Sequence, residues 1–246
     1  MGRAAVVVAS SSDEDVTVAV FAQPDGSLFD TVATCGYATA VTNPSTFSFV
    51  DFVSEQGRIY PQYEGRSVWD VRLVDGHEDA ETTVGMADIL AHSEFYEREG
   101  WPPHYIALYC QQTSRSGGEL FVIDGYAILE RISEEMKAAL RTTRVTFSSE
   151  PSIRSVTTGE EASKEVLSVH PDGSIVLQYD TSVLRKSEHR MLREFSDVVE
   201  STSATSRILI PLERGSLVIW DNFRMLHGRT MFSDKRRWLQ RICFDR

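Results

Sequence analysis

The stretch of sequence that decides the fold is Val218-Ile219-Trp220-Asp221-Asn222-Phe223-Arg224-Met225-Leu226-His227-Gly228-Arg229. We interpret its first part, with the preceding residues, as a strand over Ser216–Trp220, because β-branched and aromatic residues are enriched in strands. The strand is expected to run into a turn that presents His227 at its end. The polar residues follow the pattern Asp-Asn-x-Arg-x-x-His-x-Arg, which is much more specific than a pair of ligand-type residues.

A histidine presented in this way suggests a metal centre. A mononuclear iron site that activates oxygen is held on one face by two imidazoles and one carboxylate, which leaves adjacent positions open. In sequence, such a site takes the form His-x-Asp/Glu followed by a distant His. Three tripeptides fit the first part: His77-Glu78-Asp79, His92-Ser93-Glu94 and His170-Pro171-Asp172. The short motif therefore needs its context before it identifies a site.

Two of the three tripeptides have simpler explanations. His170-Pro171-Asp172 overlaps the turn signal Pro171-Asp172-Gly173, in which an Asp is explained by hydrogen bonds to the local backbone. His77-Glu78-Asp79 lies in an acidic stretch, residues 75–81, which is typical of a solvated loop. The third tripeptide is the one whose neighbours carry further information.

The residues that follow His92-Ser93-Glu94 resemble those of a known family. They are Phe95-Tyr96, Gly100-Trp101-Pro102-Pro103, a strand over Tyr105–Gln111, Ser116-Gly117-Gly118-Glu119-Leu120 and Asp124-Gly125. With the Asp-Asn-x-Arg-x-x-His-x-Arg run, they resemble the taurine dioxygenase and clavaminate synthase-like superfamily of Fe(II)- and 2-oxoglutarate-dependent oxygenases. The resemblance covers about residues 68–129 and 207–244, and the motifs follow the family's order along the chain.

The resemblance implies a ligand set. His92, Glu94 and His227 would be both the catalytic residues and the ligands of Fe(II), with 2-oxoglutarate as cosubstrate and O2 as oxidant. Members of the wider family that halogenate have a small residue in place of the carboxylate ligand. Glu94 therefore argues against halogenation.

The resemblance also implies a cosubstrate site in the run Arg236-Arg237-Trp238-Leu239-Gln240-Arg241. In the family, the first Arg of an Arg-x-x-x-Arg pair grips the far carboxylate of 2-oxoglutarate, and a guanidinium does this through two parallel hydrogen bonds. Arg237 would take that role, and Arg241 would help with the cosubstrate or with a substrate carboxylate. Arg236 and Lys235 are better explained as a solvated basic turn. The chain departs from much of the family at Leu120, where a Thr usually helps to hold 2-oxoglutarate.

The rest of the sequence predicts a mainly β chain with flanking helices. Short segments rich in β-branched or aromatic residues predict strands: Val16–Ala22, Tyr105–Gln111, Glu119–Ile123, Glu165–Val169, Ser174–Tyr179, Arg207–Leu212, Ser216–Trp220 and Leu239–Phe244. Pro24-Asp25-Gly26 and Pro171-Asp172-Gly173 predict hairpin turns. Two apolar stripes predict core-facing helices: Ile128, Ile132, Met136 and Leu140, and Met191, Leu192, Phe195, Val198 and Val199. The resemblance implies a double-stranded β-helix, a cupin-like jelly roll of two facing sheets.

The length of the chain fits one domain over residues 1–246, because β-rich domains of this size commonly stay undivided. Residues 148–164 are rich in Ser, Thr and Glu and have no periodicity, so we expect a loop there. A loop of this length is either a lid over a site or disordered.

Composition limits the location and the partners. No apolar run is long enough to span a membrane. The net charge of -11 and the pI near 5.0 argue against nucleic acid and anionic lipid as partners. Three widely spaced cysteines give no disulfide or zinc pattern, so a reducing, cytoplasmic location is expected.

The expected function is hydroxylation of a C–H bond of a small-molecule substrate, an amino acid or a related polar metabolite. Desaturation, ring formation and demethylation begin with the same hydrogen abstraction and stay open. Two further alternatives are a β-barrel of the same ancestry that binds metal or ligand without turnover, and a zinc hydrolase with the same three ligands. The oxoglutarate arginine counts against both.

Overall fold

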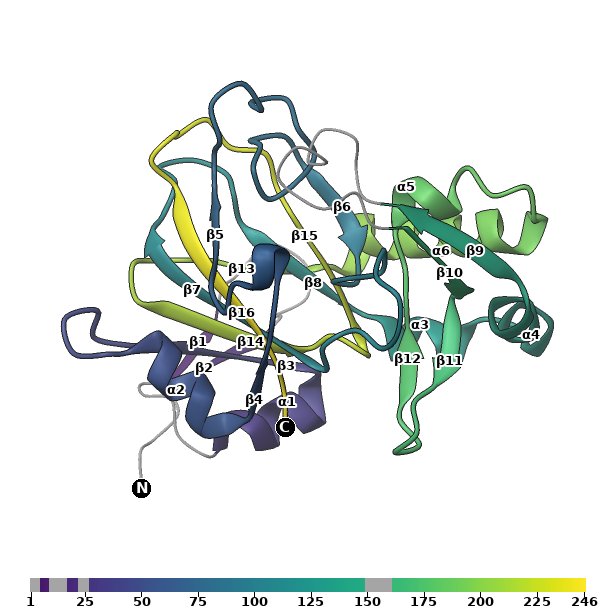
Figure 1. Cartoon of the computed structure of the whole chain (residues 1–246), viewed down its shortest axis with the longest axis horizontal. Helices are drawn as coiled ribbons and strands as arrows, with labels where there is room; N and C mark the ends of the chain where they lie inside the picture. Colours follow the sequence, from purple (N-terminus) through teal and green to yellow (C-terminus); the bar gives the residue numbers. More distant parts are fainter. Residues whose placement is uncertain (1–4, 9–16, 22–26, 149–160) are drawn as a thin grey trace.

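The structure is a computed structural model that describes residues 5–8, 17–21, 27–148 and 161–246 (Figure 1). Two β-sheets form its centre. The larger sheet has the strand order β1-β2-β3-β14-β7-β16-β4, with β5 also paired to β16, and only its β2–β3 pair is parallel. Its strands are β1 (Ala5–Val8), β2 (Thr17–Phe21), β3 (Tyr37–Val41), β4 (Arg58–Tyr60), β5 (Trp69–Arg72), β7 (Tyr105–Gln112), β14 (Ser216–Asp221) and β16 (Trp238–Asp245).

The smaller sheet is antiparallel and has the order β13-β8-β15-β6. Its strands are β6 (Ile89–His92), β8 (Leu120–Asp124), β13 (Ile208–Ile210) and β15 (Met225–Arg229). Two hairpins lie outside the two sheets, β9 (Arg144–Ser148) with β10 (Glu161–Glu165) and β11 (Leu167–Val169) with β12 (Ile175–Leu177).

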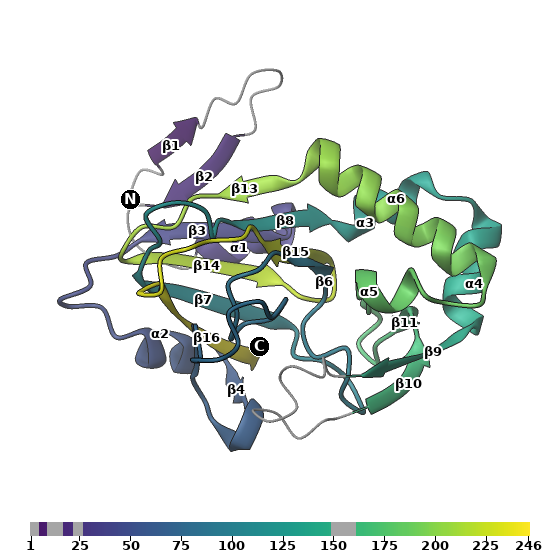
Figure 2. The ribbon, with the colours of Figure 1, turned by 90° about the horizontal axis from the view of Figure 1, so that it is seen from above.

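The helices divide into two groups. The first group lies against the larger sheet, and the second lies with the two hairpins beyond the smaller sheet, at the right of Figure 1 and Figure 2. The first comprises α1 (Ser27–Cys35) and α2 (Phe49–Gln56). The second comprises α3 (Gly125–Arg131), α4 (Glu134–Thr142), α5 (Thr181–Leu184) and α6 (Arg190–Ser206).

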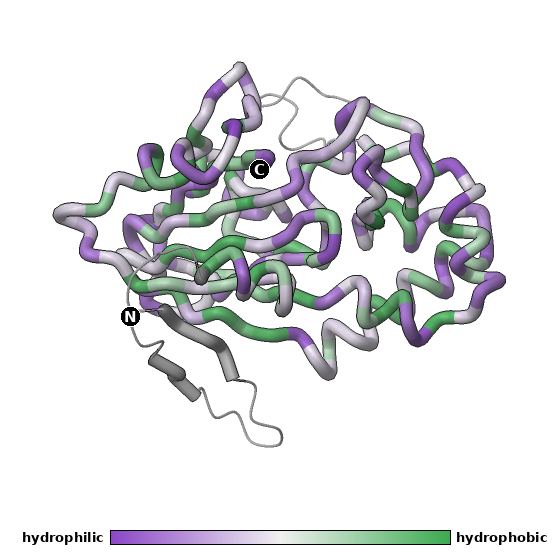
Figure 3. The backbone as a smooth tube through the Cα atoms, turned by 90° about the horizontal axis from the view of Figure 1, so that it is seen from below, coloured by the Kyte–Doolittle hydropathy of each residue, from purple (hydrophilic) through white to green (hydrophobic). Residues whose placement is uncertain are grey.

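Alternation of side chains along the strands divides the core into three layers. On β7, Ile106 and Leu108 belong to the cluster between the two sheets, whereas Ala107 and Tyr109 pack on the opposite face with α1 and α2. Successive side chains of a strand point to opposite faces, so a strand covered on both faces is apolar throughout. Figure 3 shows this as apolar stretches along the central strands.

The smaller sheet repeats the pattern. Leu120 and Val122 of β8 point into the space between the sheets, and Phe121 and Ile123 point outward. The outward residues pack with buried side chains of α3, α4 and α6. Two facing sheets with helices on their outer faces confirm the predicted mainly β jelly roll.

The local predictions were wrong at three places. His227 does not end a turn: the chain turns at residues 222–224, and His227 is the middle residue of β15. The stripe from Ile128 to Leu140 is two helices, because Ile132 is extended and the hydroxyl of Ser133 accepts a hydrogen bond from Met136 N as a new N-cap. The segment Glu165–Val169 is divided between β10 and β11.

The predicted loop at 148–164 also needs correction at its ends. Ser148 belongs to β9 and residues 161–164 belong to β10, which pairs antiparallel with β9. The strand pattern is inconspicuous because only alternate residues are buried, Phe147 and Ala162 among them. Residues 149–160, the centre of the suggested lid, lie outside the described residues, as does the predicted turn Pro24-Asp25-Gly26. Among the helices that the structure describes, none is long and apolar enough to cross a membrane.

Candidate active site

Two histidines lie side by side on adjacent strands of the smaller sheet. His92 ends β6, and its Cα is the register partner of that of His227 in β15. Ala91 and Leu226, the neighbours of these histidines, pack on the outer face, so both imidazoles point inward. The two ring centroids are 4.2 Å apart. Each residue, together with Glu94, offers a ligand atom within 4.8 Å of the other two.

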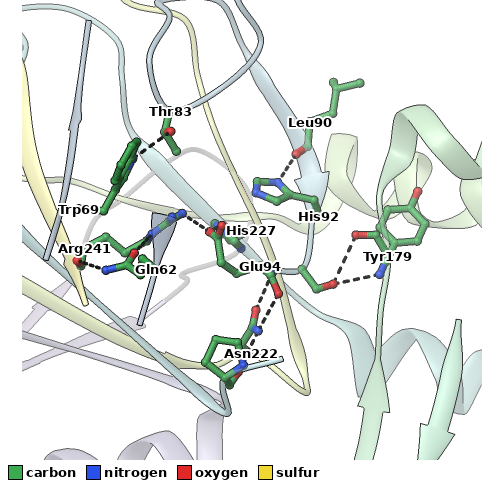
Figure 4. Close-up of polar contacts among 12 residues, drawn as sticks. Gln62, Trp69, Thr83, Leu90, His92, Glu94, Tyr179, Asn222, His227 and Arg241 are labelled. Carbon is green, nitrogen blue, oxygen red and sulfur yellow. Dashed lines mark hydrogen bonds and ion pairs between the residues drawn. The ribbon is translucent and has the colours of Figure 1, made fainter. Parts of the chain in front are cut away.

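Glu94 is held in place through its backbone. Its N–H donates to the side-chain oxygen of Asn222 at 2.8 Å, and its carbonyl accepts from the amide nitrogen of Asn222 at 3.2 Å (Figure 4). The same amide nitrogen also donates to the Pro103 carbonyl at 3.0 Å. The next residue, Phe95, has a φ of 61°, which is uncommon for a residue with a side chain. The chain thus turns sharply just after the carboxylate, and Asn222 fixes that turn.

The Asp-Asn-x-Arg run owes its specificity to structure. Asp221 accepts a hydrogen bond from Phe223 N and closes the turn that leads to β15. Arg224 pairs with Asp124 at 2.5 Å, and Asp124 is itself the N-cap of α3. The residues that precede His227 therefore connect β14, β15 and α3.

Burial and the neighbouring Arg241 together set the protonation states of Glu94 and His227. Burial alone would raise the pKa of Glu94, but the guanidinium of Arg241, 2.6 Å from its carboxylate, and the contact with His227 outweigh burial and lower that pKa. Burial lowers the pKa of His227 to about 4. Gln62 holds Arg241 in place, accepting from its Nε and donating to its carbonyl, both at 2.9 Å. At neutral pH the cluster therefore presents a neutral His227 and an ionised Glu94.

These donors suit a divalent transition metal. His92 Nδ1 lies 2.9 Å from the Leu90 carbonyl, the partner that commonly orients a metal-binding imidazole and leaves Nε2 free. His227 Nδ1 is buried and has no hydrogen-bond partner in the described structure. Two imidazoles and one carboxylate match the ligand set of non-haem Fe(II) oxygenases.

A pocket on one side of the three residues is basic. It holds about 440 Å³ of empty space and contains three arginines, Arg229, Arg237 and Arg241, all nearly fully buried. Burial lowers the pKa of Arg237 to about 10, and burial together with the charge of Arg237 lowers the pKa of Arg229 to about 9. All three keep their charge at neutral pH.

A second pocket, of about 660 Å³, also borders His92 and Glu94 but is acidic. Its other acidic side chains are Glu81, Glu97 and Asp180, and none of the described Lys or Arg residues lines it. Burial raises the pKa of Glu97, whose carboxylate accepts a hydrogen bond from the Tyr63 hydroxyl at 3.2 Å. His92 and Glu94 therefore line both the basic and the acidic pocket, and His227 lines the basic one.

The structure brings the tripeptide selected from the sequence, His92-Ser93-Glu94, next to His227, but the sequence did not predict the residues that hold them in place. His170 and Asp172 pair with each other in their turn, at 2.9 Å, as local structure predicts. Within the described residues, neither they nor His77 join a cluster of three ligand-type side chains. The contribution of Gln62 was missed, because a single Gln that is distant in sequence from Arg241 belongs to no recognisable motif. Arg229 lies two residues after His227, which places both side chains on one face of the strand.

Comparison with known families agrees with this site. The model of the family "Taurine catabolism dioxygenase TauD, TfdA family" matches residues 44–243. The chain belongs to this family. It is an Fe(II)- and 2-oxoglutarate-dependent non-haem iron dioxygenase that uses O2.

Solved structures share the fold at low sequence identity. Asparagine oxygenase in complex with Fe(II), 2S,3S-3-hydroxyasparagine and succinate is 20% identical, with a TM-score of 0.72 over 89% of this chain and 78% of that one. The non-haem iron oxygenase OrfP in complex with Fe and alpha-ketoglutaric acid is 15% identical, with a TM-score of 0.67 over 90% of this chain and 80% of that one. At these low identities, the structural likeness is evidence for the fold alone.

Proposed function

We propose that His92, Glu94 and His227 bind Fe(II), and that the enzyme hydroxylates a C–H bond of an amino acid or a closely related metabolite. The observation that carries the proposal is that the three residues lie together and that two of them, His92 and Glu94, line both a basic and an acidic pocket. The basic pocket suits the dianion 2-oxoglutarate, and the acidic pocket suits a substrate with an ammonium group.

The side chains of the basic pocket would bind the cosubstrate. Arg237 has one guanidinium nitrogen, Nη1, without a partner, and a buried donor of this kind is stabilised by an anion. Arg241 also keeps one free nitrogen, Nη2, beside Glu94. We assign Arg237 to the far carboxylate of 2-oxoglutarate, and Arg241 to the cosubstrate or a substrate carboxylate. Leu108, Leu120 and other apolar side chains line the same pocket and would exclude water.

When iron and 2-oxoglutarate are bound, they supply the oxidation of an unactivated C–H bond, and the protein supplies position and a dry site. Asp180 lines the acidic pocket, as Glu97 does, and its carboxylate also caps α5. These carboxylates would attract the α-ammonium group that every amino acid carries. Asparagine oxygenase and OrfP, which is known in complex with (3S)-hydroxy-L-Arg, have amino acid ligands of this kind.

Three cysteines without a disulfide support a cytoplasmic location, which would also keep iron reduced. The net charge of -11 supports a small-molecule partner rather than nucleic acid or an anionic membrane.

The first test is anaerobic titration of the Fe(II)-loaded protein with 2-oxoglutarate. The chelate should give a weak visible charge-transfer band, and a folded His92→Ala variant should lose it. If well-folded, iron-loaded wild-type protein gave no band, the proposed site would be wrong.

The substrate class needs a separate test. Amino acids, with asparagine and arginine first, are incubated with the loaded enzyme and compared with their N-acetyl derivatives. We expect product with one added oxygen, by mass spectrometry, from free amino acids only. Equal turnover of the acetylated compounds would contradict a role for the acidic pocket in binding the ammonium group.

A further inference from the structure

Arg229 is a buried cation with no role in the site described so far. It lies on β15 two residues after His227 and therefore points, like His227, into the space between the sheets. Only 4% of its surface is exposed. Its Nη2 donates to the Ala87 carbonyl, but its Nε and Nη1 have no hydrogen-bond partner in the described structure. A buried guanidinium with two free donors indicates that an anion binds next to it.

Arg229 and Arg237 form a pair. Both guanidinium groups pack against Phe232, with their central carbons 4.8 Å and 5.0 Å from the centre of its ring. Arg237 is anchored by a 2.9 Å hydrogen bond from its Nη2 to the Gly118 carbonyl, which leaves its Nη1 free. Two anchored cations in one buried pocket repel each other, and a carboxylate between them would remove that repulsion.

Few other groups in this part of the pocket can serve an anion. Leu120 is the register partner of Arg229 across β8 and β15, and it offers no hydrogen-bond donor. Leu239 and Val71 are also apolar. The third arginine, Arg241, pairs with Glu94 through Nη1 and keeps one free nitrogen, Nη2, and the indole nitrogen of Trp220 in the same pocket is also unpartnered. Of these groups, Arg229 is the one that packs with Arg237 against Phe232, so its free donors are the ones next to Arg237.

We infer that Arg229 is a second guanidinium for the distal carboxylate of 2-oxoglutarate, which it binds together with Arg237 in place of a hydroxyl at Leu120. The inference rests on the proposed function, since it requires 2-oxoglutarate to occupy the basic pocket. Arg229 then favours a dicarboxylate over other 2-oxo acids.

The test compares two ligands that differ only at the distal end. 2-Oxoglutarate and 2-oxopentanoate share a five-carbon 2-oxo acid, but 2-oxopentanoate ends in a methyl group. Their dissociation constants are measured by anaerobic calorimetry on Fe(II)-loaded wild-type protein and on the Arg229→Leu, Arg237→Leu and Arg236→Leu variants. Arg236 is the matched control, because it lies in the same run but is exposed and pairs with Asp234.

We expect Arg229→Leu to weaken 2-oxoglutarate binding about 10- to 100-fold, which is the usual effect of losing a hydrogen bond to a charged group. Binding of 2-oxopentanoate should change less than about threefold, so that the preference for the dicarboxylate collapses. Arg236→Leu should leave both constants unchanged. If Arg229→Leu kept the wild-type preference, or weakened both ligands equally, Arg229 would be only structural and the inference would be overturned.

Two further results separate the possible failures. If wild-type protein bound 2-oxoglutarate no better than 2-oxopentanoate, the proposed function would fail and the inference with it. If Arg229→Leu did not fold, Arg229→Lys would replace it, because lysine keeps the charge but loses the two-pronged geometry. That variant should show the same loss of preference to a smaller degree, and an undiminished preference would count against the inference.

Discussion

Replacing Asn222 by alanine should release the backbone of Glu94 from the turn between β14 and β15. Asn222 is 1% exposed and its side chain makes three hydrogen bonds, at 2.8, 3.2 and 3.0 Å, to the backbone of Glu94 and Pro103. The substitution leaves three buried backbone groups unsatisfied, at about 1–2 kcal/mol each. We therefore expect the free energy of unfolding of the metal-free protein to fall by about 3–5 kcal/mol, a large part of the usual stability of a domain.

Urea denaturation and Fe(II) titration measure the two effects of this change. The matched control is Asn43→Ala, since Asn43 is exposed and its side chain accepts a single hydrogen bond, from Ser45 N. That control should change stability by less than about 0.5 kcal/mol. Asn222→Ala should also weaken metal binding about 10- to 100-fold, because it loosens a ligand. If Asn222→Ala were no more destabilising than the control, the backbone clamp would not be what positions Glu94.

Three further predictions concern charged groups of the site. Arg237→Leu should weaken 2-oxoglutarate binding about 10- to 100-fold and leave metal binding intact; an unchanged chelate titration would exclude its assigned role. The pKa of His227 is about 4 when folded and 6.5 ordinarily, so the unfolded chain binds more protons between these values. Stability of the metal-free protein should be full above pH 6.5 and about 2 kcal/mol lower at pH 5, by urea denaturation, and the slope should flatten in His227→Gln. Arg241→Met leaves the Glu94 carboxylate buried without its cation, which should cost the metal-free protein about 3–5 kcal/mol. Metal should then raise the melting temperature more in this variant than in wild type, and a smaller rise would contradict the pairing.

The sequence predicted the central strands well because they are buried on both faces. Segments such as Tyr105–Gln111 and Ser216–Trp220 are nearly continuous apolar runs, and the structure has β7 and β14 there. The strand predicted over Val16–Ala22 is β2, but the elements between β2 and β7 were missed for the opposite reason. β3 reads Tyr-Ala-Thr-Ala-Val, and its small residues give little strand signal although four of the five are buried. β6 is only four residues long.

In the site, the sequence predicted that His92, Glu94 and His227 lie together, and they do so in the structure, because metal chemistry restricts the types of residue. It could not show that Asn222 holds the backbone of Glu94, since the two are 128 positions apart and amide-to-backbone contacts leave no pattern. The pairing of Arg241 with Glu94 was hidden as well, because the sequence does not show which arginine lies nearest the carboxylate.

The pairing of β6 with β15 has a consequence for the biogenesis of the enzyme. His92 and His227 become neighbours only when these two strands pair. Under the proposed function, a chain that has not yet paired them offers iron an incomplete set of ligands. Capture of iron would therefore follow the pairing of β6 with β15, and bound metal would indicate that this sheet has formed.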